Sequence, residues 1–177
     1  EQIKIANFLT AVDEKIYYLT QKHDLLTQYK KGVMQQIFSQ ELRFKDDDGV
    51  DFPEWELSEL GEFIDEFKEK STVENQHRVL TSARTGLVPQ DEYFEEGRLS
   101  RKDNLGFNIV PLGFVTYRSR SDDGIFKFNL NTLGYTGIIS TYYPVFNLIN
   151  CSNKFFIELT EFYKGDFGKY SVGTSQT

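Results

Sequence analysis

The sequence predicts an α/β protein of the α+β type, in which a long amino-terminal coiled-coil helix precedes a globular, mainly antiparallel β-rich domain with short helices. Two observations lead to this fold class. Apolar residues recur at alternating spacings of four and three through residues 5–37, whereas short runs of β-branched and aromatic residues, separated by turn residues, occupy much of residues 79–149. With 177 residues, 39% of them hydrophobic, the chain can bury one core in addition to the helix.

The first element is a helix within residues 1–45, from about residue 3 to residue 39. Ten positions at heptad spacing form a stripe that we call the seam, and eight of them are apolar. The polar ones, His23 and Lys30, would fix register and partner at some cost in stability. Such a stripe predicts pairing with a second helix or with another copy of the chain. The seam consists of Ile5, Leu9, Val12, Ile16, Leu19, His23, Leu26, Lys30, Val33 and Ile37.

The next segment, residues 46–56, is predicted to be a linker. Its acidic run at 46–48 and the following Gly49 abandon the apolar period of the helix. Residues 57–177 then form the globular domain. Its first stretch, 57–67, is open to two interpretations, because its apolar spacing permits a short helix while Gly61 equally permits a strand or a turn.

The remaining elements are predicted mostly as strands. Residues 79–82 form a short strand that turns through 83–86 into a second extended run, and residues 107–118 form two extended pieces around a turn at 111–113. Residues 125–130 alternate, and 136–149 form one or two strands interrupted at Pro144. Helical spacing returns at residues 155–163 behind Ser152, which is a suitable N-cap. The strand-rich domain therefore closes with a helix.

The sequence predicts no catalytic residue and no metal site. It contains no glycine-rich phosphate loop and no nucleophile elbow, and its two histidines, His23 and His77, lie far apart. The single cysteine, Cys151, excludes an internal disulfide and favours a reducing compartment. No apolar run approaches the ~18 residues of a membrane span, and no signal-peptide pattern is present. We therefore expect a cytoplasmic protein without a membrane partner.

The charge distribution argues against indiscriminate nucleic-acid binding but leaves room for a basic face. The formal net charge is −7, and residues 53–74 contain eight acidic and two basic side chains. Residues 98–127, in contrast, contain six basic and three acidic side chains. DNA-binding proteins normally present a basic patch to phosphate, so the second region is where such a patch is expected.

Four segments resemble the central conserved region of the specificity subunit of type I restriction-modification systems. They are residues 1–9 (EQIKIANFL), 12–16 (VDEKI), 29–45 (YKKGVMQQIFSQELRFK) and 52–56 (FPEWE). Beyond residue 56 the chain resembles a target-recognition domain of that family more loosely, through residues 137–140, 143–146 and 173–177. The resemblance thus covers the helix and linker closely and the globular domain loosely.

The resemblance implies a non-catalytic subunit that recognises DNA. In this family each recognition domain reads one half of a split double-stranded DNA target, and the conserved helices that separate the domains pack antiparallel. The chain would then be the central helix and the second domain, a fragment that stops before the distal conserved helix. Its partners would be DNA and the methylation and restriction subunits, and only those subunits would use S-adenosylmethionine, ATP and Mg. The alternatives are a coiled-coil scaffold with a protein-binding globular domain and, more remotely, a fused methyltransferase fragment.

Candidate DNA-contacting residues follow from the side-chain chemistry of base recognition. Arg reads guanine, and small hydroxyl groups contact either bases or phosphate. The densest stretch of such residues is 116–121, where Arg118 and Arg120 are the predicted central readers, with Arg84 beside them. The alternative is an exposed strand end with solvated arginines. The remaining predicted contacts are Ser82, Thr85, Tyr117, Ser119, Lys127 and Lys169, the last of which is expected to meet phosphate.

Overall fold

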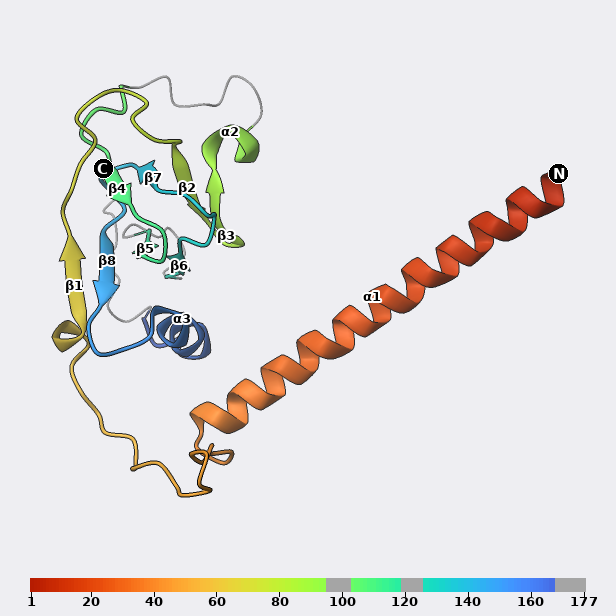
Figure 1. Cartoon of the computed structure of the whole chain (residues 1–177), viewed down its shortest axis with the longest axis horizontal. Helices are drawn as coiled ribbons and strands as arrows, with labels where there is room; N and C mark the ends of the chain where they lie inside the picture. The colour runs from red at the N-terminus through yellow and green to blue at the C-terminus, as the bar shows by residue number, and fades with distance from the viewer. Residues whose placement is uncertain (95–102, 119–125, 168–177) are drawn as a thin grey trace. The chain divides into compact units, whose positions relative to one another are not determined.

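A computed structural model describes residues 1–94, 103–118 and 126–167 of the chain (Figure 1). The chain divides into two compact units, Glu1–Glu54 and Trp55–Thr177, and each is described by itself. The predicted α+β class is confirmed at this level, because a long helix is followed by antiparallel sheets and short helices.

The first unit is dominated by α1, Gln2–Phe38, a continuous helix of 37 residues (Figure 1). At 1.5 Å per residue it is about 55 Å long. The heptad spacing therefore predicted the helix correctly, and the backbone leaves it at Ser39 and Gln40, where Gln40 adopts a positive φ of 64°. No second helix packs on α1 within this unit, so its coiled-coil pairing remains a prediction.

The segment after α1 is more ordered than a simple solvated linker. The Asp46 carboxylate accepts hydrogen bonds from the backbone N–H groups of Asp48 (3.0 Å) and Val50 (2.8 Å), which closes a tight turn. Arg43 donates to the Glu54 carboxylate (2.5 Å) and to the Phe52 carbonyl (2.9 Å). The helix therefore ends at Phe38, eight residues before the acidic run, and the first carboxylate of that run builds a separate turn.

The second unit contains a four-stranded antiparallel sheet of order β1-β8-β5-β6. Two smaller antiparallel pairs, β2 with β3 and β4 with β7, complete the described strands. An isolated parallel bridge joins Val79 to Ile138. The strands are β1 Ile64–Phe67, β2 Leu80–Ala83, β3 Gly86–Pro89, β4 Asn108–Val110, β5 Val115–Tyr117, β6 Phe128–Leu130, β7 Gly137–Ile139 and β8 Val145–Leu148.

Three short helices accompany the strands in the described part of this unit. The stretch 57–67, open to two interpretations, forms the 3-10 turn η1, Leu60–Glu62, followed by β1. The closing helix is α3, Asn153–Phe162, and the Ser152 side chain caps it by accepting from the Phe155 N–H at 3.4 Å, as predicted. The sequence pattern did not predict α2, Gln90–Tyr93.

A charge-assisted contact explains how so short a helix as α2 is held. Arg78, which precedes β2, donates two hydrogen bonds to the Asp91 carboxylate (3.1 and 2.9 Å) and one to Glu92 (2.8 Å). The hydrogen bond to Asp91 raises the pKa of Arg78, and the reciprocal bond lowers the pKa of Asp91. Arg78 therefore pairs with two carboxylates of α2.

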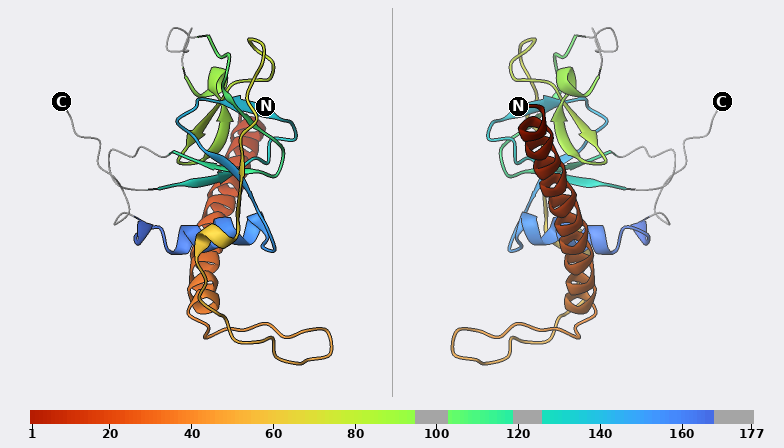
Figure 2. Two further views of the ribbon diagram at one scale, coloured as in Figure 1. Left: turned by 90° about the vertical axis from the view of Figure 1, so that its left-hand side faces the viewer. Right: turned by 90° about the vertical axis from the view of Figure 1, so that its right-hand side faces the viewer.

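The two faces of the large sheet pack against different neighbours. One face places Val115, Phe128, Phe146 and Leu148 in a cluster with Phe156 of α3. The other face turns Val145 toward a second cluster, which is completed by Leu80, Leu87, Val110 and Ile139 from the smaller strand pairs. Figures 1 and 2 agree, since both show α3 on one side of β6 and the β2–β3 hairpin on the other. Strand β6 thus lies between two layers.

Candidate nucleic-acid interface

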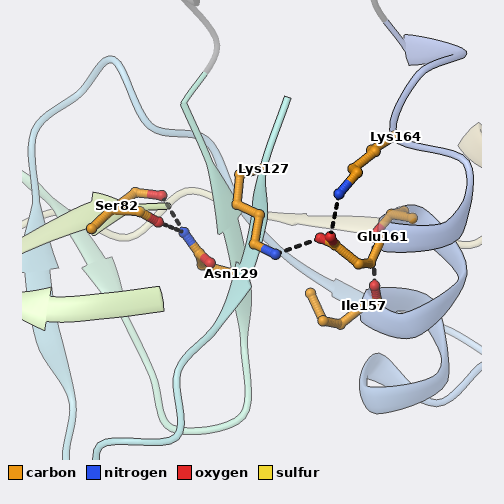
Figure 3. A network of polar contacts seen from close by, with 8 residues as sticks. Ser82, Lys127, Asn129, Ile157, Glu161 and Lys164 are labelled. Carbon is orange, nitrogen blue, oxygen red and sulfur yellow. Dashed lines mark hydrogen bonds and ion pairs between the residues drawn. The ribbon is translucent and has the colours of Figure 1, made fainter. Parts of the chain in front are cut away.

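A buried amide fastens one predicted DNA-contacting segment, residues 82–85, to strand β6. Asn129 in β6 has only 4% of its surface exposed, and its Nδ2 group donates to Ser82 Oγ at 2.7 Å and to the Ala83 carbonyl at 2.9 Å (Figure 3). Ser82 and Ala83 are the last residues of β2, and the exposed residues Arg84 and Thr85 follow them in the turn to β3. The turn that carries Arg84 is therefore anchored to the large sheet.

A second pair of basic residues lies at the end of the adjoining strand pair. Tyr117 of β5 is in register with Phe128 of β6. Arg118 directly follows Tyr117 and Lys127 directly precedes Phe128, so both basic residues lie at the same end of this pair. Lys127 is two residues from Asn129, but it pairs with Glu161 of α3, whereas Asn129 reaches Ser82 of the hairpin on the other side of β6 (Figure 3).

Among the predicted DNA contacts, Tyr117 is an aromatic residue that packs against the hydrophobic core. Its ring packs against Phe126, Phe128 and Phe146, with centroid separations of 6.3, 5.0 and 6.4 Å. Aromatic packing of this kind stabilises the face of the sheet that meets α3. Core packing thus accounts for an aromatic residue next to Arg118. The sequence pattern alone did not distinguish this packing role from DNA contact.

Lys127 takes part in an ion-pair cluster with α3 (Figure 3). Its Nζ atom lies 2.5 Å from Glu161 Oε2, and Lys164 Nζ lies 2.8 Å from Glu161 Oε1. Burial would raise the pKa of Glu161, but the hydrogen bonds from the two lysines outweigh it and lower that pKa. Glu161 is therefore a charged carboxylate shared by two ammonium groups, and the cluster carries a net charge of about +1 near neutral pH.

Three predicted contacts lie outside the described residues: Ser119, Arg120 and Lys169. The structure therefore supports no statement about their positions. Of the described candidates, Ser82, Arg84 and Thr85 lie in or beside the turn that Asn129 anchors, and Arg118 and Lys127 lie at one end of the β5–β6 pair. Asn129, which fastens the end of β2 to β6, was not among the candidates. The alternation of residues 125–130 places it with Lys127 on the polar face, so the sequence pattern did not predict its burial.

The seam of α1 is open along most of its length within the first unit. Its apolar residues from Ile5 to Leu26 have between 40% and 57% of their surface exposed to solvent. The residues that directly precede the seam positions form a second series with the same spacing. Four members of this series have 64–71% of their surface exposed to solvent. These four are Phe8, Tyr18, Leu25 and Tyr29, and the series also contains Lys4, Lys15 and Lys22. The sequence analysis missed this second face, although a shift of the heptad pattern by one residue would have found it.

Among the residues that the structure describes, no group of three His, Cys, Asp or Glu side chains is arranged to hold a metal ion. Within the same ranges, no helix combines the length and the apolar character needed to cross a bilayer.

Comparison with known proteins found no match. No family model matches the chain, and neither a curated protein nor a solved structure is similar to it. A function for the chain therefore has to be inferred from its residues and their arrangement.

Proposed function

We propose that this chain is a DNA-recognition unit of the specificity subunit of a type I restriction-modification complex. It reads one half of a bipartite target and positions the methylation and restriction subunits. The observation that carries the proposal is the anchoring of the Arg84 turn by Asn129, beside the strand end that carries Arg118 and Lys127. The resemblance of residues 1–56 to the family's central conserved region supports the same function.

The chemistry of this region suits a base-reading surface of modest size. Arg84 and Arg118 are exposed, and guanidinium groups bind guanine through two parallel hydrogen bonds. A short turn fixed to a buried sheet keeps such a side chain near one position, which lowers the entropic cost of binding. Because the whole chain is acidic, the methylation subunits supply much of the phosphate attraction in the assembled complex.

The helix α1 has the properties of a spacer with partners. Its length of about 55 Å sets a rigid distance between half-sites. The seam accommodates the second conserved helix or another copy of the chain, and the second apolar face offers separate area to a partner subunit. The chain itself performs no catalysis in this proposal, since S-adenosylmethionine, ATP and Mg serve the partner subunits. The complex acts in the cytoplasm.

Arginine replacement in the assembled complex tests the proposal. The target is first identified by methylome sequencing of a strain that carries the full-length subunit, and binding to that duplex is then measured. Arg118→Ala is expected to cost about 1 to 3 kcal/mol of cognate affinity while hardly changing non-specific binding. Arg84→Ala and Arg120→Ala are tested in parallel.

Lys68→Ala provides a control. Lys68 follows β1, at the opposite edge of the four-stranded sheet from β6, and its replacement should leave cognate affinity unchanged. The assignment of this face would be wrong if the three arginine variants kept both the cognate affinity and the methylation pattern of the wild type.

The second candidate function is a coiled-coil scaffold whose globular domain binds protein. The exposed apolar seam favours it, because a stripe of this kind requires a partner whether or not the chain binds DNA. A gel-shift assay with the intact subunit and its methylation partners separates the two functions. A shift of cognate duplex supports DNA recognition, and no shift of any duplex supports the scaffold.

A further inference from the structure

The cluster of Lys127, Glu161 and Lys164 joins two parts of the domain that are distant in sequence. Lys127 immediately precedes β6, whereas Glu161 and Lys164 belong to the end of α3 and the turn after it (Figure 3). Each oxygen of the Glu161 carboxylate accepts from one lysine, at 2.5 and 2.8 Å. One carboxylate thus holds two ammonium groups on its two sides.

This arrangement leaves donors available for an anion. A lysine ammonium group has three N–H donors, and one from each lysine is directed at Glu161. Side-chain exposure is 36% for Lys127 and 57% for Lys164, so both remain accessible from solvent. The remaining donors can therefore reach the oxygens of a phosphate while the carboxylate keeps the two cations in place.

We propose that Lys127 and Lys164 are DNA-phosphate contacts whose strength Glu161 sets. The inference rests on the proposed DNA-binding function and deepens it, because it assigns phosphate contact to α3 beside the strand end that bears Arg118. Glu161 is a positioning residue in two senses. It orients both ammonium groups, and its negative charge reduces their combined charge from about +2 to about +1, which weakens sequence-independent attraction.

Salt dependence of binding measures this charge balance directly. Each cation that neutralises a phosphate contributes about 0.9 to the slope of log K against log salt. Lys127→Met and Lys164→Met are each expected to flatten the slope by about 0.9, whereas Glu161→Gln is expected to steepen it by a similar amount. The double variant Glu161→Gln/Lys127→Met has the wild-type net charge and should recover a slope near that of the wild type.

The experiment uses the chain assembled with its methylation subunits and a fluorescein-labelled duplex of arbitrary sequence, titrated at several salt concentrations beginning at about 20 mM. The matched controls are Lys68→Met and Glu66→Gln, which break an exposed ion pair of 2.9 Å at the opposite edge of the sheet. Neither control should alter the slope. Lys127→Arg keeps the charge and should behave as the wild type.

Three outcomes decide the matter. Opposite changes of slope in the lysine and Glu161 variants support the inference. If the duplex binds but every variant keeps the wild-type slope, the cluster only fastens α3 to β6 and the inference is overturned, while DNA binding stands. If the wild-type complex binds no duplex even at the lowest salt, both the inference and the proposed DNA binding are overturned. Urea unfolding of each variant shows that the proteins compared are folded.

Discussion

Replacement of Asn129 tests whether one buried amide holds the Arg84 turn in place. In Asn129→Ala the Ser82 hydroxyl and the Ala83 carbonyl lose their donors, which lie at 2.7 and 2.9 Å. Each lost hydrogen bond costs about 0.5 to 1.5 kcal/mol, and a buried carbonyl left without a partner adds to the cost. Since Asn129 is 4% exposed, water cannot readily replace the amide. We expect the free energy of unfolding to fall by about 2 to 3 kcal/mol.

Urea unfolding of the whole chain, followed by tryptophan fluorescence, provides the measurement. With a slope of roughly 1 to 3 kcal/mol per molar urea for a chain of this size, the midpoint should shift by about 0.7 to 3 M. Thr132→Ala is the control, because Thr132 is a polar residue three positions further along the same segment and its side chain is exposed. That variant should remain within about 0.5 kcal/mol of the wild type.

A double-mutant cycle identifies the contact itself. Ser82→Ala removes the hydroxyl that Asn129 contacts and should cost about 1 kcal/mol in the wild-type background. It should cost much less in the Asn129→Ala background, because the hydrogen bond is already absent there. Additive effects of the two replacements, or an Asn129→Ala midpoint within about 0.3 M of the wild type, would refute the bridging role.

Three further predictions concern the helix, the ion-pair cluster and the core. The exposed seam should drive self-association, because each apolar side chain contributes roughly 1.5 to 3 kcal/mol on full burial. The pairing should be antiparallel, since parallel pairing would place Lys30 against its own copy. Light scattering at tens of micromolar should report a dimer that Leu19→Lys dissociates, and a strict monomer would contradict the prediction. The lowered pKa of Glu161 means that the cluster contributes its stability above the ordinary value of 4.5 and loses it as the pH falls through the lower folded-state pKa. Glu161→Gln should therefore flatten the stability curve in that acidic window and not above it, which urea midpoints across the pH range will show. Gly137→Ala should destabilise the domain by about 1 to 3 kcal/mol, since the added Cβ would overlap the buried Leu80 side chain, and a wild-type melting temperature would count against that packing.

The sequence by itself determined the elements whose signals are local. Heptad spacing determined α1 and its open seam, and the Ser152 cap determined where α3 begins. The hairpin around Arg84 and the interruption at Pro144 followed from turn chemistry. Each of these signals lies within a few residues of the element that it specifies, so no knowledge of the fold was required.

Tertiary structure decided which strands pair and which side chains meet. Strands β4 and β5 follow one another around a turn, yet β4 pairs with β7 whereas β5 pairs with β6 and β8. Tyr117 and Arg118 are adjacent in sequence, but the Tyr117 ring packs in the core, while Asn129 meets Ser82 from 47 residues away. These outcomes depend on which sheet face each layer covers and on the need of every buried polar group for a partner. Burial of that kind is a property of the assembled layers, and no single segment encodes it.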